Sequence, residues 1–143
     1  MTWEECANVK FEKAKSEKDA NIRITFKGDI MSTAIGTDAD SYKPDSMSLN
    51  GLDDKYPPSL VGRGDILHEF GHALGLEHEH QSPSAADVVT LDEDKVRDHY
   101  AKQGTPQQPI EGQRSWEEIN IIDRIQEDET RNYTNMDTAS IMM

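Results

Sequence analysis

The residue types best suited to chemistry gather in one stretch, His68-Glu69-Phe-Gly-His72-Ala-Leu-Gly75-Leu-Glu-His78. On a helix, residues four apart lie one turn above each other on the same face. His68 and His72 can therefore point both imidazoles at one ion, at about 2.0–2.1 Å for zinc. Glu69 would lie beside such an ion without binding it, and is placed to take a proton from a metal-bound water.

His78 is the third candidate ligand, and it requires a turn in the chain. A straight helix would carry His78 away from the other two histidines. Gly75 tolerates a positive φ, so a sharp turn there can bring His78 back. Three imidazoles leave a fourth position open for water, which is the mark of a catalytic zinc site. The spacing predicts one catalytic Zn²⁺ held by His68, His72 and His78, with Glu69 as the catalytic general base.

These residues fill every fixed position of H-E-x-x-H-x-x-G-x-x-H, so the sequence resembles the metzincin zinc peptidases. The continuation Glu79-His-Gln-Ser-Pro83 resembles the astacin-like branch. Near the C-terminal end, Ser140-Ile-Met-Met143 is similar to the segment whose methionine forms the Met-turn beneath the zinc. That similarity places Met142 at the turn. The family's tyrosine two places further on, an additional zinc ligand in astacins, has no counterpart because the sequence stops at Met143.

The resemblance implies a fold, an activity and a location. The fold would be α+β, with a small twisted mixed sheet over a long active-site helix and a lower subdomain of helix and loop. We expect residues 1–143 to form a single metallopeptidase catalytic domain, trimmed at both ends relative to the family. The activity would be zinc-dependent endopeptidase hydrolysis of a peptide or protein, lying extended along the sheet edge. The location would be extracellular, although Met1–Cys6 is too polar for a signal peptide.

Three strands and one helix must position this site. Ile22, Ile24 and Phe26 alternate with polar residues and predict a half-buried strand with these three side chains inward. Shorter strands are expected over 32–35 and 46–49, and another near 8–14. Helical spacing of apolar residues predicts the zinc-binding helix over about 65–75, with Asp65 as N-cap and Gly75 as terminator.

Three further helices begin with capping-box sequences, in which a Ser or Thr side chain and a Glu three residues later satisfy free backbone donors. Thr2–Glu5 opens a short helix. Thr90–Glu93 opens one that runs to about Gln103, and Ser115–Glu118 opens one through Ile125. Residues 104–114 and 127–143 are expected to be loops.

Composition limits the partners. The net charge of −13 would repel nucleic acid, so none is expected as a partner. No apolar run approaches the ~20 residues of a membrane helix, so no membrane partner is expected either. Cys6 cannot form a disulfide within the chain, because it has no second cysteine, and we expect it to be a small buried side chain. The sequence does not indicate an oligomeric state.

Two alternatives remain open. The chain could be a zinc-binding but catalytically inactive fragment, or an interaction domain that uses Arg63-Gly-Asp65, a tripeptide known from integrin ligands. His80 could support the metal ligands, but we expect a solvated loop residue. His99 lies in a charged helix and is expected to be exposed.

Overall fold

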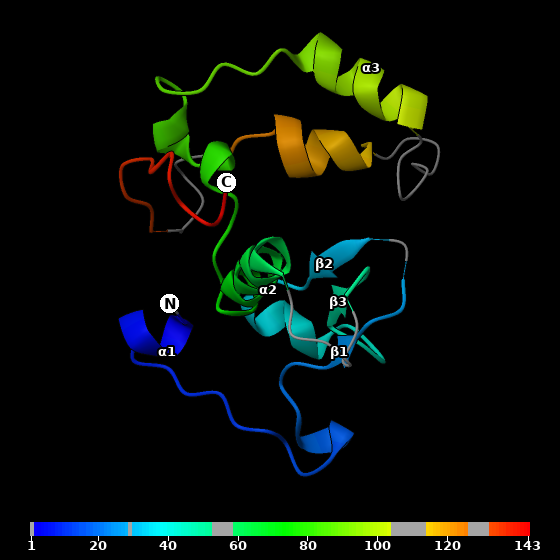
Figure 1. Cartoon of the computed structure of the whole chain (residues 1–143). Coiled ribbons are helices and arrows are strands. Elements are labelled where there is room, and N and C mark those ends of the chain that lie inside the picture. The colour runs from blue at the N-terminus through cyan, green and yellow to red at the C-terminus, as the bar shows by residue number, and fades with distance from the viewer. Residues whose placement is uncertain (1, 29, 53–58, 104–113, 126–131) are drawn as a thin grey trace. The chain divides into compact units, whose positions relative to one another are not determined.

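The computed structural model describes residues 2–28, 30–52, 59–103, 114–125 and 132–143 (Figure 1). The chain forms two compact units, one made of Met1–Glu77 with Met142 and the other of His78–Ile141 with Met143. The first unit holds all three strands and the helices α1 and α2, whereas the second holds α3 and several short helical turns. The α+β class expected from the sequence is confirmed.

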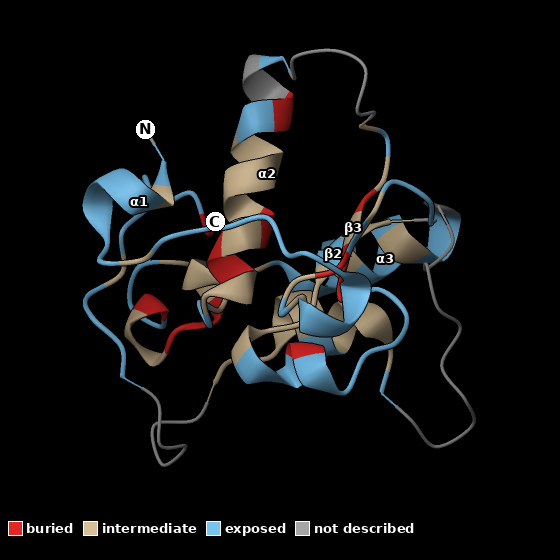
Figure 2. Ribbon diagram, turned by 90° about the horizontal axis from the view of Figure 1, so that it is seen from below, coloured by how far each residue is buried: buried red, intermediate tan, exposed pale blue. Residues whose placement is uncertain are grey.

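The sheet of the first unit is small and mixed, as predicted. Its strands are β1 (Ile24–Thr25), β2 (Met31–Thr33) and β3 (Met47–Leu49), in the order β1-β3-β2. Strand β3 runs parallel to β1 and antiparallel to β2. Helix α2 (Leu60–Ala73) packs against β2 and β3, and Figure 2 shows buried residues on both β3 and α2. The two short strands expected over 32–35 and 46–49 therefore exist, at 31–33 and 47–49, each one residue shorter than predicted.

The predicted inward face of the first strand is wrong. Ile24 and Phe26 are exposed, whereas Arg23 is 6% exposed. The Arg23 guanidinium donates hydrogen bonds to five backbone oxygens, those of Ala20, Asn21, Ala39, Tyr42 and Pro44. A buried charged group is tolerated only when its donors are satisfied, and here carbonyl groups satisfy them. The arginine thus fastens the loop before β3 to β1 and takes the inward position that alternation assigns to an apolar residue.

Helix α2 begins earlier than its apolar pattern indicates. Its N-cap is Ser59, whose hydroxyl accepts from the Gly62 backbone N–H at 3.1 Å, so the prediction that Asp65 caps the helix is wrong. The stretch from Leu60 to Gly64 contains two glycines, which are poor helix formers, and a good cap offsets part of that cost. As a consequence, Arg63-Gly-Asp65 lies within a helix.

The N-terminal segment is mostly extended. Helix α1 (Trp3–Cys6) has the predicted capping box, in which the Glu5 carboxylate accepts from the Thr2 backbone N–H at 2.6 Å. The strand expected near residues 8–14 does not form there. Cys6 is a free and exposed thiol, which contradicts the expectation that it is buried. In a helix of this length few side chains have neighbours to pack against.

The second unit contains the two further helical segments predicted. Helix α3 (Glu93–Gln103) begins after Asp92, whose carboxylate accepts from the Lys95 backbone N–H. Asp92 therefore caps this helix, and the prediction that Thr90 and Glu93 open it as a capping box is wrong. The capping box at Ser115 and Glu118 is complete, since each side chain accepts from the backbone N–H of the other residue. The helical segment it opens ends in a π-helical turn, Glu118–Ile122, rather than continuing to Ile125.

Short 3-10 turns connect these elements, at Glu17–Asp19, Gly36–Asp40, Glu79–Gln81 and Pro83–Ala85. The expected loops lie partly outside the described residues, at 104–113 and 127–131, while 132–143 contains turns and no helix or strand. His99 is exposed, as expected. No described helix has the length and apolar character needed to cross a bilayer.

Candidate metal centre

The half of α2 that carries His68 and His72 ends in a turn built around Gly75. Its φ is +96°, a left-handed conformation that glycine adopts with little strain. The Gly75 N–H donates to the carbonyl of His72 at 2.8 Å, and the Leu76 N–H donates to that of Gly71 at 3.0 Å. This pair of bonds is the Schellman motif, which closes a helix and reverses the chain. The predicted role of Gly75 as terminator is thus confirmed.

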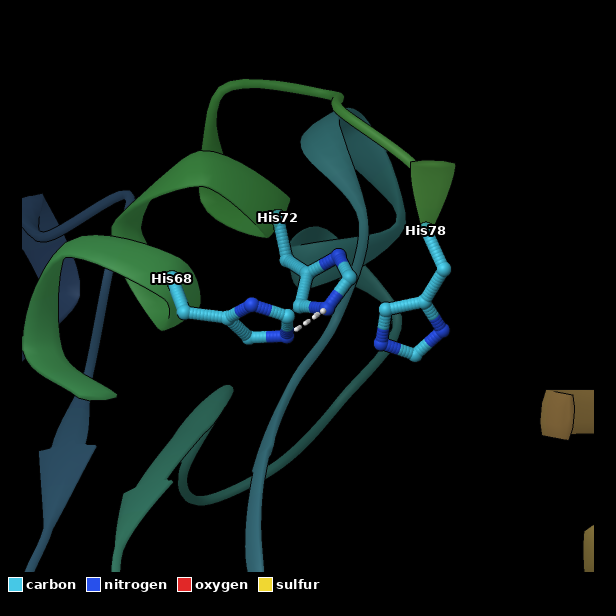
Figure 3. A group of neighbouring side chains, drawn as sticks. All are labelled: His68, His72 and His78. Carbon is cyan, nitrogen blue, oxygen red and sulfur yellow. Dashed lines mark hydrogen bonds between the residues drawn. The ribbon is translucent and has the colours of Figure 1, made fainter. Parts of the chain in front are cut away.

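The structure brings the three predicted ligands together. One nitrogen of each of His68, His72 and His78 lies within 4.8 Å of the other two (Figure 3). Among the described residues, this is the group of His, Cys, Asp or Glu side chains close enough together to hold one metal ion. His68 and His72 come from successive turns of α2, and His78 follows the turn at Gly75.

The chemistry of this donor set fits a zinc ion. The Nε2 atoms of His68 and His72 are 3.1 Å apart. Two nitrogens bound tetrahedrally to one zinc, each at about 2.05 Å, lie about 3.3 Å apart. His72 Nδ1 lies 2.8 Å from the Leu76 carbonyl oxygen, which can only accept, so Nδ1 carries the proton and Nε2 carries the lone pair.

Burial also favours the neutral form that binds a metal. It lowers the pKa of His72, and the nearby His68 lowers it further, against the raising effect of the hydrogen bond to Leu76. Only a neutral imidazole nitrogen has a lone pair to donate. The turn at Gly75 thus has two effects. It redirects the chain toward His78, and it places the carbonyl of Leu76, the residue after Gly75, where it orients the His72 ring.

His78 is held from its other side by Gln81. The Nδ1 atom of His78 lies 3.1 Å from Gln81 Oε1. His80 stacks on His78, with ring centroids 5.3 Å apart and planes inclined by 25°. The Nε2 atom of His80 is buried and has no hydrogen-bond partner among the described residues, and burial lowers the pKa of this imidazole. The expectation that His80 is solvated is therefore wrong.

Glu69 lies beside the histidines and is 5% exposed. Its Oε2 accepts a hydrogen bond of 2.6 Å from the Thr33 hydroxyl, at the end of β2. Burial raises the pKa of Glu69 most strongly, whereas the Thr33 hydrogen bond and the neighbouring His68 act in the opposite direction. A buried carboxylate with one oxygen anchored is an arrangement suited to accepting and returning a proton.

Met142 lies against the same turn of α2. It is 3% exposed, and a Cβ added at Gly71 would overlap its sulfur atom and approach the Trp3 ring to 3.1 Å. The Trp3 indole N–H donates to the Leu67 carbonyl at 2.8 Å. Gly71 therefore leaves room for both side chains, directly before His72. This places Met142 against α2, where the Met-turn was expected.

Two residues that contact the candidate site, Thr33 beside Glu69 and Gln81 beside His78, were not assigned a role from the sequence. Thr33 comes from a strand that was predicted, but its distance from Glu69 along the chain gave no sign of a contact. Gln81 stands three residues after His78, which is the spacing of one 3-10 turn, so a prediction of that turn could have paired them.

Comparisons with known proteins agree with these observations. A family model described as Astacin, a family of peptidases, matches residues 1–114. Zinc metalloproteinase nas-36 of Caenorhabditis elegans is 31% identical over 98 residues, which are 68% of this chain and 14% of that protein. Astacin-like metalloprotease toxin 2 of Loxosceles intermedia is 35% identical over 96 residues, covering 66% of this chain and 33% of the toxin.

A solved structure is similar over almost the whole chain. The structure of myroilysin matches with a TM-score of 0.75 at 29% identity, covering 98% of this chain and 65% of that one. The chain thus spans 14% and 33% of the curated relatives above, and 65% of the myroilysin chain.

Proposed function

Because this chain belongs to the astacin family of peptidases, we propose that it is a zinc-dependent endopeptidase. The observation that carries the proposal is the convergence of His68, His72 and His78, whose ligand nitrogens lie within 4.8 Å of one another. In this proposal the three histidines are the metal ligands, Glu69 is the general base, and residues 1–143 belong to one catalytic domain.

The proposed role of each group follows from its contacts. When bound, zinc would polarise the scissile carbonyl and lower the pKa of a water molecule to about 7. Glu69 takes a proton from the water molecule while the water oxygen attacks the carbonyl carbon. It returns that proton to the amine nitrogen as the C–N bond breaks. Thr33 holds Oε2 of Glu69, which leaves Oε1 to carry the proton. No covalent acyl-enzyme forms.

The substrate we propose is a peptide or protein in extended conformation. Among the described strands, β2 pairs with β3 on one side only, so it is an edge of the sheet. An exposed edge can add a substrate strand through backbone hydrogen bonds. Since Thr33 closes β2 and contacts Glu69, a peptide along this edge would pass close to the base.

The location we propose is extracellular. The proposal rests on the family, and one relative is, by its name, a toxin. Expression of the complete natural gene product with a C-terminal tag, followed by detection in medium and in cells, tests it.

The test of the activity is hydrolysis of quenched fluorescent casein by the zinc-loaded chain. We expect hydrolysis that a chelator abolishes and that returning zinc restores. Glu69→Ala should reduce the rate by about 10²–10⁴-fold, the usual contribution of a positioned base, while zinc content stays at one ion per chain.

Each other outcome has a meaning. Hydrolysis that survives Glu69→Ala would overturn the assignment of the base. No hydrolysis by a chain that holds one zinc would favour the zinc-binding but inactive fragment. Failure to bind zinc at all would overturn the site itself.

A further inference from the structure

The Gln81 side chain has all its hydrogen-bonding groups engaged, which allows its orientation to be deduced. It is 7% exposed. Its amide nitrogen Nε2 donates to the carbonyl oxygens of Ile119 at 2.8 Å and of Asp123 at 3.0 Å. Carbonyl oxygens only accept, so the atom between them must be the NH₂ group with its two N–H bonds. The atom that faces His78 is therefore the amide oxygen.

This orientation determines where the proton of His78 resides. The amide oxygen only accepts, and it lies 3.1 Å from His78 Nδ1. Nδ1 must then carry the hydrogen in the neutral imidazole, which leaves the lone pair on Nε2. The opposite tautomer would place two acceptors against each other in a partly buried site. His72 reaches the same state in a different way, since its Nδ1 faces the backbone carbonyl of Leu76.

The same amide links the ligand to a distant part of the sequence. Besides the two bonds from its side chain, the backbone oxygen of Gln81 accepts from the Ile125 N–H at 2.8 Å. These bonds attach the turn Glu79–Gln81 to the segment 119–125, which follows the capping box at Ser115. The position of the His78 ring thus depends on a helical turn that is remote in sequence.

We propose that Gln81 is a positioning residue for the metal centre, which selects the Nδ1–H tautomer of His78 and anchors that ring to the turn Glu118–Ile122. The inference rests on the proposed function, because it takes His78 to be a zinc ligand. Partners that orient a ligating histidine commonly contribute 10–100-fold to metal affinity.

Two substitutions at one position separate this role from a purely structural one. Gln81→Met removes the acceptor that faces His78 and should weaken zinc binding about 10–100-fold. Gln81→Glu keeps an acceptor for Nδ1–H but turns a carboxylate oxygen toward two carbonyl oxygens. Gln81→Glu should therefore unfold more readily than Gln81→Met and yet bind zinc more tightly. Zinc affinity would be measured by chelator competition, and folding by thermal unfolding of the metal-free chain.

Arg124→Gln is the matched control. Arg124 joins the turn Glu79–Gln81 to the segment 119–125 by donating to the carbonyl of His80, and it also donates to that of Val89. Both of these bonds end on backbone oxygens. This variant should lose stability with little change in zinc affinity. If zinc affinity instead followed stability across all three variants, Gln81 would be a structural residue only and the inference would be wrong.

A direct measurement does not depend on any variant folding. Long-range ¹H–¹⁵N NMR of the metal-free natural chain distinguishes the two tautomers of each neutral histidine. We expect His78 with its hydrogen on Nδ1, and the hydrogen on Nε2 would overturn the proposal. His78→Ala separates failure of the proposed metal site from failure of the role of Gln81. Unchanged zinc affinity in this variant would show that His78 is not a ligand, which would overturn the proposed site itself.

Discussion

At the scale of the residue, the pairing of Glu69 with Thr33 decides how the proposed base is presented. The hydroxyl binds one carboxylate oxygen at 2.6 Å and fixes the rotation of the group. Catalysis by a positioned base is sensitive to such orientation, because a displacement of about 1 Å can cost 10²-fold. Thr33 also ends the edge strand, so one residue connects the strand proposed to hold substrate with the base proposed to act on it.

Thr33→Val should lower kcat about 10–100-fold, because it removes a hydrogen bond to a charged group worth about 1.5–3 kcal/mol while keeping the side-chain shape. Thr33→Ser keeps the hydroxyl and should restore most of kcat. Steady-state kinetics on a quenched peptide would separate kcat from KM, and zinc content should be unchanged in both variants.

A different kinetic pattern would contradict this role. If Thr33→Val raised KM and left kcat unchanged, Thr33 would act on the binding of substrate and not on the base.

At the scale of the element, Gly71, Met142 and Trp3 pack closely at the turn of α2 that carries His72, which restricts the size of the side chain at position 71. A methyl group at position 71 would overlap the Met142 sulfur atom. In an open helix, Gly→Ala is favourable by about 1 kcal/mol. Here an overpacking cost of about 1–3 kcal/mol opposes it.

Gly71→Ala should therefore destabilise the chain by up to about 2 kcal/mol, the difference between these two effects. Urea unfolding would measure it. Combining Gly71→Ala with Met142→Ala gives the control, because the two substitutions share one contact and their costs should not add. Additive costs would mean that the methionine does not limit position 71.

The capping box at Ser115 and Glu118 is an element whose stability should depend on pH. The backbone N–H of Ser115 and then Arg97 lower the pKa of Glu118, since both favour the carboxylate. A group whose pKa is lower in the folded state stabilises that state above its unfolded pKa. This contribution is lost as the pH falls through the folded pKa.

Glu118→Gln should therefore lower Tm most near neutral pH, and the difference from the natural chain should shrink below the ordinary glutamic acid pKa of about 4.3. Thermal unfolding over a pH series measures it. Asp98→Asn is the control, because Asp98 and Lys102 form an exposed ion pair of 3.7 Å that should matter little at any pH. A Glu118→Gln deficit that is constant with pH would show that charge is not involved.

At the scale of the whole molecule, the metal should contribute to folding as well as to chemistry. The three proposed ligands come from α2 and from beyond Gly75 and meet only when the chain is folded, so zinc should bind the folded state. At a free zinc concentration 100 times the dissociation constant, such binding stabilises by about 2.7 kcal/mol.

Tm should therefore rise with free zinc and fall when a chelator is added, as calorimetry can show. His72→Ala provides the comparison, because it removes one ligand and should make Tm insensitive to zinc. If zinc raised Tm equally in that variant, it would be binding elsewhere.

The motif could be identified in the sequence because its spacing is a local property. Residues four apart on a helix must share a face, and a glycine can reverse the chain after it, whatever surrounds them. The family, the α+β class, the three histidines as candidates and the capping boxes at Thr2 and Ser115 therefore followed from short stretches. The family resemblance is confirmed by the match over residues 1–114, while the roles of the individual site residues stay predictions.

Only the tertiary structure decided which distant groups meet. Arg23 lies inward because carbonyls of residues 39–44 surround it, and no alternation of apolar residues contains that information. Thr33 reaches Glu69, and Gln81 reaches residues 119 and 123, across long stretches of chain. Local sequence determines the period of a helix and the position of its ends, whereas side-chain partners across the fold depend on how elements pack.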